Sequence, residues 1–318
     1  MENSSESYYV PAQSHWPIIG AVGLTSTLGG GALILHSMQQ GQASLFSQIV
    51  LISGVLILAG MMFGWFASVV AETRKGLYSP QLDISFRMGM SWFIFSEVMF
   101  FAAFFGALWY VRNLAGPWLG GESDAGRFNY LLWESFSYEW PMMETPQDAV
   151  GGVSGQITAN NGVMTGPERN MSFPGWNNIF HWLPLWNTVI LMSSSVTAHI
   201  AHLALLAGNR KKQNIWLGIT VALGMIFVYL QYLEYHEAYV DYGLFLSSGI
   251  YGSTFFMLTG FHGFHVCMGA FMLLVQWLRS TRGGHFTKED HFGFEASSWY
   301  WHFVDVVWVG LFLFVYII

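Results

Sequence analysis

The sequence predicts an all-α integral membrane protein with seven transmembrane helices. Three observations carry this prediction: an apolar composition, seven long apolar stretches, and a one-sided distribution of basic residues. Hydrophobic residues fill 53% of the 318 positions and charged residues only 10%, whereas a soluble domain devotes about a quarter of its residues to charge. The mean hydropathy of +0.41 agrees. A soluble enzyme is therefore excluded.

The apolar stretches have the length that a membrane helix needs, because crossing about 30 Å of hydrocarbon takes roughly 20 residues. They lie at about 17–37, 46–71, 86–111, 182–207, 215–233, 244–278 and 297–318. Lipid offers backbone groups no partners and the stretches are too long for barrel strands, so each is expected to be a helix. Residues 1–16 contain no Lys or Arg. We therefore expect no cleaved signal peptide and a retained first span.

The sixth stretch could be one long tilted helix or two short spans joined near Gly260–Gly263. The basic residues decide between these alternatives. Nine of the twelve lie on one side of the membrane if there are seven spans: Arg74, Lys75, Arg87, Arg210, Lys211, Lys212, Arg279, Arg282 and Lys288. The positive-inside rule then places the N-terminus in the cytoplasm and the C-terminus in the periplasm. Two short spans would move the last three residues across the membrane, so seven spans are favoured.

The connection at about 114–180 is the only sizeable region outside the predicted spans. It holds seven acidic and two basic residues, and Ala149 to Gly166 is rich in turn-forming residues. The aromatic segments Tyr130 to Trp140 and Phe173 to Trp182 are candidates for the membrane interface. No basic stripe suggests a nucleic-acid partner.

Ionisable residues inside the spans are candidate functional residues, since they are costly in lipid and usually face the bundle interior or a water-filled cavity. They are Glu97, His199, His202, His262, His265, His302 and Asp305. The spacing places His199 with His202, and His262 with His265, on one helix face each. A metal site and interhelical hydrogen bonds are the competing interpretations. Carboxylate-bridged di-iron bundles use Glu-x-x-His, which neither pair has, and the single Cys267 excludes a multi-thiolate site. No metal is predicted.

Glu97 has no basic residue within a turn on its own helix. It is either a proton relay or polar ligand for a lipid head group, or a protonated carboxyl that is hydrogen-bonded across helices. Four polar residues at the outer end of the fifth span are expected to form a solvated helix end: Glu234, His236, Glu237 and Asp241.

Small residues recur in the first two spans, as Gly29-Gly30-Gly31 and Gly60-x-x-x-Gly64. Such patterns permit close approach of helices. We expect these glycines to lie at helix contacts, within the chain or against another subunit.

Several runs resemble the haem–copper cytochrome c oxidase subunit III family. The longest are Tyr251 to Phe256 with Thr259 to Val266 in the sixth span, and His291 to Ala296 with Trp299 to Trp308 in the seventh. Supporting runs are His15-Trp16-Pro17, Ser96 to Phe101, and Gly208 to Lys211. They occur in the family's order over nearly the whole chain.

The resemblance implies a non-redox accessory subunit of a proton-pumping oxidase in a bacterial inner membrane. Spans one–two (residues 1–72) and three–seven (residues 73–318) would form a V-shaped cleft that holds phospholipids. The subunit would pack on catalytic subunit I, with subunit II in the same complex and cytochrome c as its substrate. Haem and copper would lie in the partner subunits, and this chain would carry no catalytic centre.

The resemblance also assigns roles to residues. Glu97 matches the family's buried carboxylate, and the other characteristic positions are His262, His265, Glu295, His302 and Asp305. The family is implied to sustain proton uptake, with His15, Tyr8 and Tyr9 as neighbours of the proton entry.

Three alternatives stay open at this point. The chain could belong to a quinol oxidase, whose subunit III is of the same type. A membrane oxygenase could use the histidine pairs to bind two metals, and a transporter could relay protons through Glu97 and His302.

The 114–180 connection is longer than in compact family members, and we hypothesise that its net charge of −5 steers a basic cytochrome c or contacts another subunit.

Overall fold

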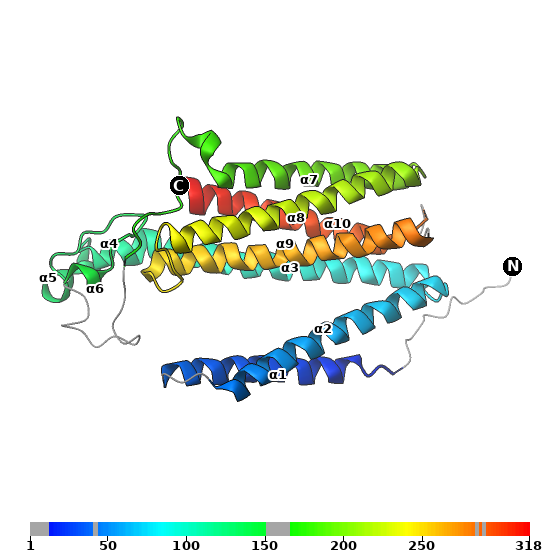
Figure 1. Ribbon diagram of the computed structural model, residues 1–318, viewed down its shortest axis with the longest axis horizontal. Coiled ribbons are helices and arrows are strands. Elements are labelled where there is room, and N and C mark those ends of the chain that lie inside the picture. The colour runs from blue at the N-terminus through cyan, green and yellow to red at the C-terminus, as the bar shows by residue number, and fades with distance from the viewer. Residues whose placement is uncertain (1–12, 41–43, 151–165, 284–285, 288–290) are drawn as a thin grey trace. The chain divides into compact units, whose positions relative to one another are not determined.

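The computed structural model describes residues 13–40, 44–150, 166–283, 286–287 and 291–318 (Figure 1). Seven helices are long and apolar enough to cross a membrane. They are α1 (Trp16–Gln39), α2 (Leu45–Arg74), α3 (Pro80–Tyr110), α7 (Leu183–Leu206), α8 (Arg210–Val240), α9 (Gly249–Gly283) and α10 (Phe292–Leu311). No strand occurs in the described part of the chain. The prediction of an all-α protein with seven membrane helices is confirmed.

The sixth apolar stretch is one helix. Helix α9 runs for 35 residues without a break at Gly260 or Gly263, as the positions of the basic residues indicated.

Helix α8 is longer than its apolar stretch because its first turn is polar. The Asn209 side chain caps this turn by accepting a hydrogen bond from the Lys212 backbone N–H, which satisfies one of the free donors at the helix start.

Contacts within the chain divide it into two compact units, residues 1–88 and 89–318. In the first unit, α1 and α2 pack closely where glycines face the other helix. A Cβ atom at Gly30 would overlap the backbone of Leu51, and one at Gly54 would overlap the backbone of Thr27. Only glycine fits at these two positions, because backbone atoms cannot move aside as a flexible side chain can.

The predicted glycine patterns lie only partly at this contact. Gly30 lies against α2 and Gly64 lies under the ring of Trp16, but a Cβ atom added at Gly29, Gly31 or Gly60 would meet nothing within 4 Å in the described part of the chain. The indole N–H of Trp16 donates to Ser68 Oγ at 3.3 Å. Sequence spacing alone could not show which glycines in each run face the partner helix.

The second unit is built around α7, α8, α9 and α10, where α7 contacts α8, α8 contacts α9, and α10 contacts both α9 and α7. Its core contains the fully buried Trp301. Cβ atoms at Gly224 and Gly269 would lie 2.7 and 2.8 Å from the Trp301 ring. The Trp301 indole N–H donates to Ser194 Oγ at 3.0 Å. Two glycines therefore make room for an indole that joins α10 to three other helices, α7, α8 and α9.

Much of the 114–180 connection packs against one end of this bundle. It contains the short helices α4 (Gly116–Leu119), α5 (Asn129–Leu132) and α6 (Pro146–Ala149). The Met171 backbone N–H donates to Tyr251 Oη at 3.0 Å, and the Phe173 backbone N–H donates to the Tyr316 carbonyl at 2.8 Å. Most of the turn-rich stretch predicted at 149–166 lies outside the described residues.

Tyr242 holds the late part of the connection. Its carbonyl accepts from the Glu168 backbone N–H at 2.8 Å, and its hydroxyl donates to Glu237 Oε1 at 2.9 Å. Burial, and then the Glu237 carboxylate, raise the pKa of Tyr242 to about 12. The phenol therefore stays protonated at neutral pH and remains a hydrogen-bond donor.

Candidate functional site

Glu97 has a partner on another helix. Glu97 Oε2 on α3 lies 2.9 Å from His265 Nε2 on α9, and the two side chains are 21% and 8% exposed. The other ring nitrogen, His265 Nδ1, lies 2.6 Å from the Phe261 carbonyl. A carbonyl can only accept, so Nδ1 must carry a proton. One further proton is then shared between Glu97 and Nε2 of His265.

Aromatic rings enclose this carboxyl–imidazole pair. The His265 ring centroid lies 5.0 Å from that of Phe101, and Tyr300 stacks on the imidazole at 6.2 Å. Phe100 packs on Phe261 at 5.0 Å, edge to face. The rings keep water away from most of the pair, which strengthens the electrostatic interaction between its two members.

The remaining predicted residues of α9 and α10 make separate contacts. His302 Nδ1 on α10 lies 2.6 Å from Ser195 Oγ on α7 and 3.9 Å from Asp305 Oδ2. The fully buried His262 places Nε2 3.2 Å from the Val304 carbonyl. His262 therefore joins α9 to α10, and His302 joins α10 to α7.

A further histidine contact lies at the start of α10. The rings of His202 and His291 are 5.7 Å apart, and His291 Nε2 lies 3.9 Å from Glu295 Oε2. His199 is exposed on α7, although it is only three residues from His202. The described residues contain no group of three or more His, Cys, Asp or Glu side chains arranged to hold a metal ion.

Of the three residues predicted to lie near the proton entry, the structure describes only His15. His15 is exposed, and its ring lies 4.4 Å from that of Trp16. Tyr8 and Tyr9 lie outside the described residues.

Glu234 is a functional candidate that the sequence interpretation missed. It was expected at a solvated helix end, but the structure buries it completely, so that prediction is wrong. Tyr316 Oη donates to Glu234 Oε1 at 2.6 Å, and the amides of Gln231 and Asn187 donate to Oε2 at 3.3 and 3.5 Å. Glu234 lies almost two turns inside α8, where side chains from α7 and the C-terminal segment cover it.

The other residues at this end of α8 differ from Glu234. His236 and Asp241 are exposed, as a solvated helix end requires. Glu237 is partly buried and accepts the hydrogen bond from Tyr242.

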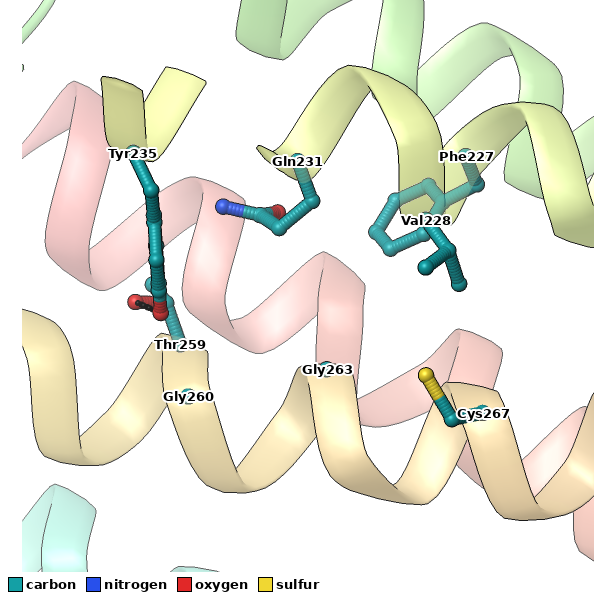
Figure 2. Close-up of a pocket in the computed structure, with 8 residues that line it drawn as sticks. All are labelled: Phe227, Val228, Gln231, Tyr235, Thr259, Gly260, Gly263 and Cys267. Atoms are coloured by element: carbon teal, nitrogen blue, oxygen red, sulfur yellow. Dashed lines mark hydrogen bonds between the residues drawn. The ribbon is translucent and has the colours of Figure 1, made fainter. Parts of the chain in front are cut away.

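A cavity of about 190 Å³ lies between α8 and α9 (Figure 2), and one of its lining residues, Gln231, is a hydrogen-bond partner of Glu234. Gln231 and Tyr235 line it on α8, and Thr259 and Cys267 line it on α9, where Gly260 and Gly263 between them add no side chain. The hydroxyls of Tyr235 and Thr259 lie 2.7 Å apart and satisfy each other. The cavity therefore presents mainly apolar surface.

Comparison with known proteins agrees with this architecture. The family model for cytochrome c oxidase subunit III matches residues 6–121 and 177–318. The chain belongs to the cytochrome c oxidase subunit III family. Proteins named cytochrome c oxidase subunit 3 from Arabidopsis thaliana and Dugong dugon are 35% and 36% identical to it over 317 and 318 residues. Each alignment covers 99% of this chain and 98% of the relative.

Membership in the cytochrome c oxidase subunit III family identifies the chain as part of an oxidase complex. The subunit III family model leaves residues 122–176 unmatched, which is most of the long connection. The Glu97–His265 pair and the Glu234 cluster both lie in matched segments. The connection is therefore the part of this subunit that departs from the family pattern.

Proposed function

We propose that the chain is the non-redox accessory subunit of a proton-pumping cytochrome c oxidase. It stabilises catalytic subunit I, binds membrane lipid and supports proton uptake, while haem and copper lie in partner subunits. The Glu97–His265 pair carries this proposal, because it places an exchangeable proton between two helices in the membrane part of the chain. The pair can hold that proton on either atom without leaving an isolated charge in lipid.

Proton uptake by the complex tests this role. We expect the oxidase that lacks this chain to take up protons more slowly at alkaline pH and to inactivate after fewer turnovers. An oxidase with the substitution Glu97→Gln retains the chain but loses the shared proton, and we expect slowed uptake with a normal subunit content. Unchanged uptake and unchanged lifetime in both complexes would contradict the proposal.

We propose that the chain binds phospholipids, with His199, His202, His262, His265, Glu295, His302 and Asp305 as interhelical or lipid-site residues. His15, Tyr8 and Tyr9 would lie near the proton entry. The charge bias of the loops supports an inner-membrane orientation with the N-terminus in the bacterial cytoplasm. A quinol oxidase is the alternative complex, and a copper site in the co-purifying subunit II would favour cytochrome c as the donor.

The long connection is proposed to attract basic cytochrome c. Six of its carboxylates are exposed: Glu122, Asp124, Glu134, Glu139, Glu144 and Glu168. Asp148 is different, because it forms a capping box with Thr145 at α6. Exposed charge of one sign raises association rates, and salt removes the effect.

Replacing the six exposed carboxylates with neutral side chains tests the effect of charge while the α6 capping box is kept. A variant with Gln or Asn at the six exposed positions and Asp148 retained should oxidise cytochrome c with a lower kcat/KM and a weaker salt dependence. An equally salt-dependent kcat/KM would contradict the steering role.

A further inference from the structure

A second cavity, of about 470 Å³, lies where α7 turns into α8. Its α7 wall includes Ile200, Leu203 and Ala207, and its α8 wall includes Lys212 and Trp216, with Asn209 between the helices. One end of the cavity is thus polar and basic, and the remainder is apolar. Such a site fits an amphiphile, with a charged head at the helix ends and a hydrocarbon tail along the helices.

The polar end has hydrogen-bond donors that find no acceptor among the described residues. The Asn209 side-chain oxygen accepts from the Lys212 backbone, so its amide N–H groups point to no acceptor within the described part of the chain. Lys212 makes no ion pair, and the Trp216 indole N–H no hydrogen bond, with any residue that the structure describes. Asn209 and Lys212 lie in the cap and first turn of a 31-residue helix, where the helix dipole favours an anion. Trp216 lies about one turn further along the same helix.

The segment that forms the cavity carries only positive charge along its sequence. Arg210 and Lys211 adjoin Lys212, and residues 169–233 contain no Asp or Glu. A zwitterionic head group would bring a cation into this basic surface, whereas an anionic head group would be attracted to each of these residues. The charge pattern therefore selects a ligand with net negative charge.

The apolar end continues onto the lipid-facing surface. Leu203 is 51% exposed and Ile215 is 53% exposed, and both lie on the membrane helices that form the cavity. An acyl chain could follow these side chains from the helix ends toward the bilayer centre. A soluble phosphate compound would leave this apolar surface unused.

We propose that this cavity binds the head group of an anionic phospholipid from the leaflet that meets the α7–α8 turn. The phosphodiester accepts from Lys212, Asn209 and Trp216, and an acyl chain lies along Ile200 and Leu203. The site is formed by the α7–α8 segment alone. It rests on the membrane topology alone, so it would survive failure of the proposed proton role.

Filling the cavity without changing charge tests the proposal. Ala207 lines the cavity and is exposed, whereas the neighbouring Leu206 is exposed but does not line it. The oxidase complex is purified with Ala207→Trp or Leu206→Trp, equilibrated with phosphatidylglycerol, and analysed by native mass spectrometry. We expect Ala207→Trp to bind one fewer lipid than the wild type, and Leu206→Trp to bind the same number.

The charge requirement is tested with Lys212→Gln. We expect this variant to bind phosphatidylglycerol about fivefold more weakly, the effect of about one surface lysine, with little change for phosphatidylcholine. Equal lipid counts for wild type and Ala207→Trp would overturn the proposal. So would equal retention of the two lipids by the wild type, or loss of a protein subunit from Ala207→Trp with its lipid count unchanged, which would assign the cavity to a partner helix.

Discussion

The Glu97–His265 contact can be measured as a coupling energy between two helices. Replacing either residue by Leu removes one partner and leaves the other polar group without its hydrogen bond. The atoms are 2.9 Å apart, and Glu97 is 21% exposed, so solvent screens part of the interaction. Hydrogen bonds between membrane helices contribute about 0.6 kcal/mol on average and up to about 1.7. We expect about 1 kcal/mol of coupling for this enclosed, ionisable pair.

A double-mutant cycle isolates that coupling. The purified chain is unfolded in mixed detergent micelles of increasing denaturing-detergent content, and tryptophan fluorescence reports the folded fraction. Glu97→Leu and His265→Leu should each destabilise the chain, and the double variant should be about 1 kcal/mol more stable than the sum of the single effects predicts. His302 contacts Ser195 instead, so the cycle of Glu97→Leu with His302→Leu should be additive. Additivity in the first cycle would refute the pairing.

Three further substitutions test the packing, each by the same unfolding measurement. Gly30→Ala should cost about 1–3 kcal/mol because its Cβ meets the backbone of α2, whereas Gly29→Ala should be neutral or stabilising, and equal effects would contradict the helix contact. Glu234→Ala should cost about 3 kcal/mol by leaving three buried donors unpaired, against less than about 0.5 for the exposed His236→Ala; similar values would show that Glu234 is solvated. Gly224→Ala should cost about 1–3 kcal/mol by overpacking the indole 2.7 Å away, and an unchanged stability would mean that the tryptophan is free to move.

The spans and their number could be predicted because they follow from local properties of the sequence. Length and apolarity identify a membrane helix whatever its neighbours are. The single long α9 was predicted correctly because an alternative topology would have placed Arg279 and Arg282 on the other side of the membrane. The predicted ends of α8 were less accurate, since a capped polar first turn has no hydropathy signal.

The partners within the site could not be predicted from one sequence. The sequence shows that Glu97 needs a partner, but His265 is 168 positions away, and only the packing of α3 against α9 brings them together. Glu234 was misjudged for a related reason. Its position near a helix end suggested access to water, whereas Tyr316 and Asn187, which are distant in sequence, bury it and supply its hydrogen bonds.

The most direct test of the account is the cofactor content of the native complex and of this chain after separation from it. The chain is purified with an affinity tag from native membranes, and the haem spectrum, copper content and subunits of the complex are recorded. We expect a complex that contains haem and copper together with subunits I and II, and a separated chain that contains neither metal centre. A chain that purifies alone, or that retains stoichiometric iron or copper after separation, would contradict it.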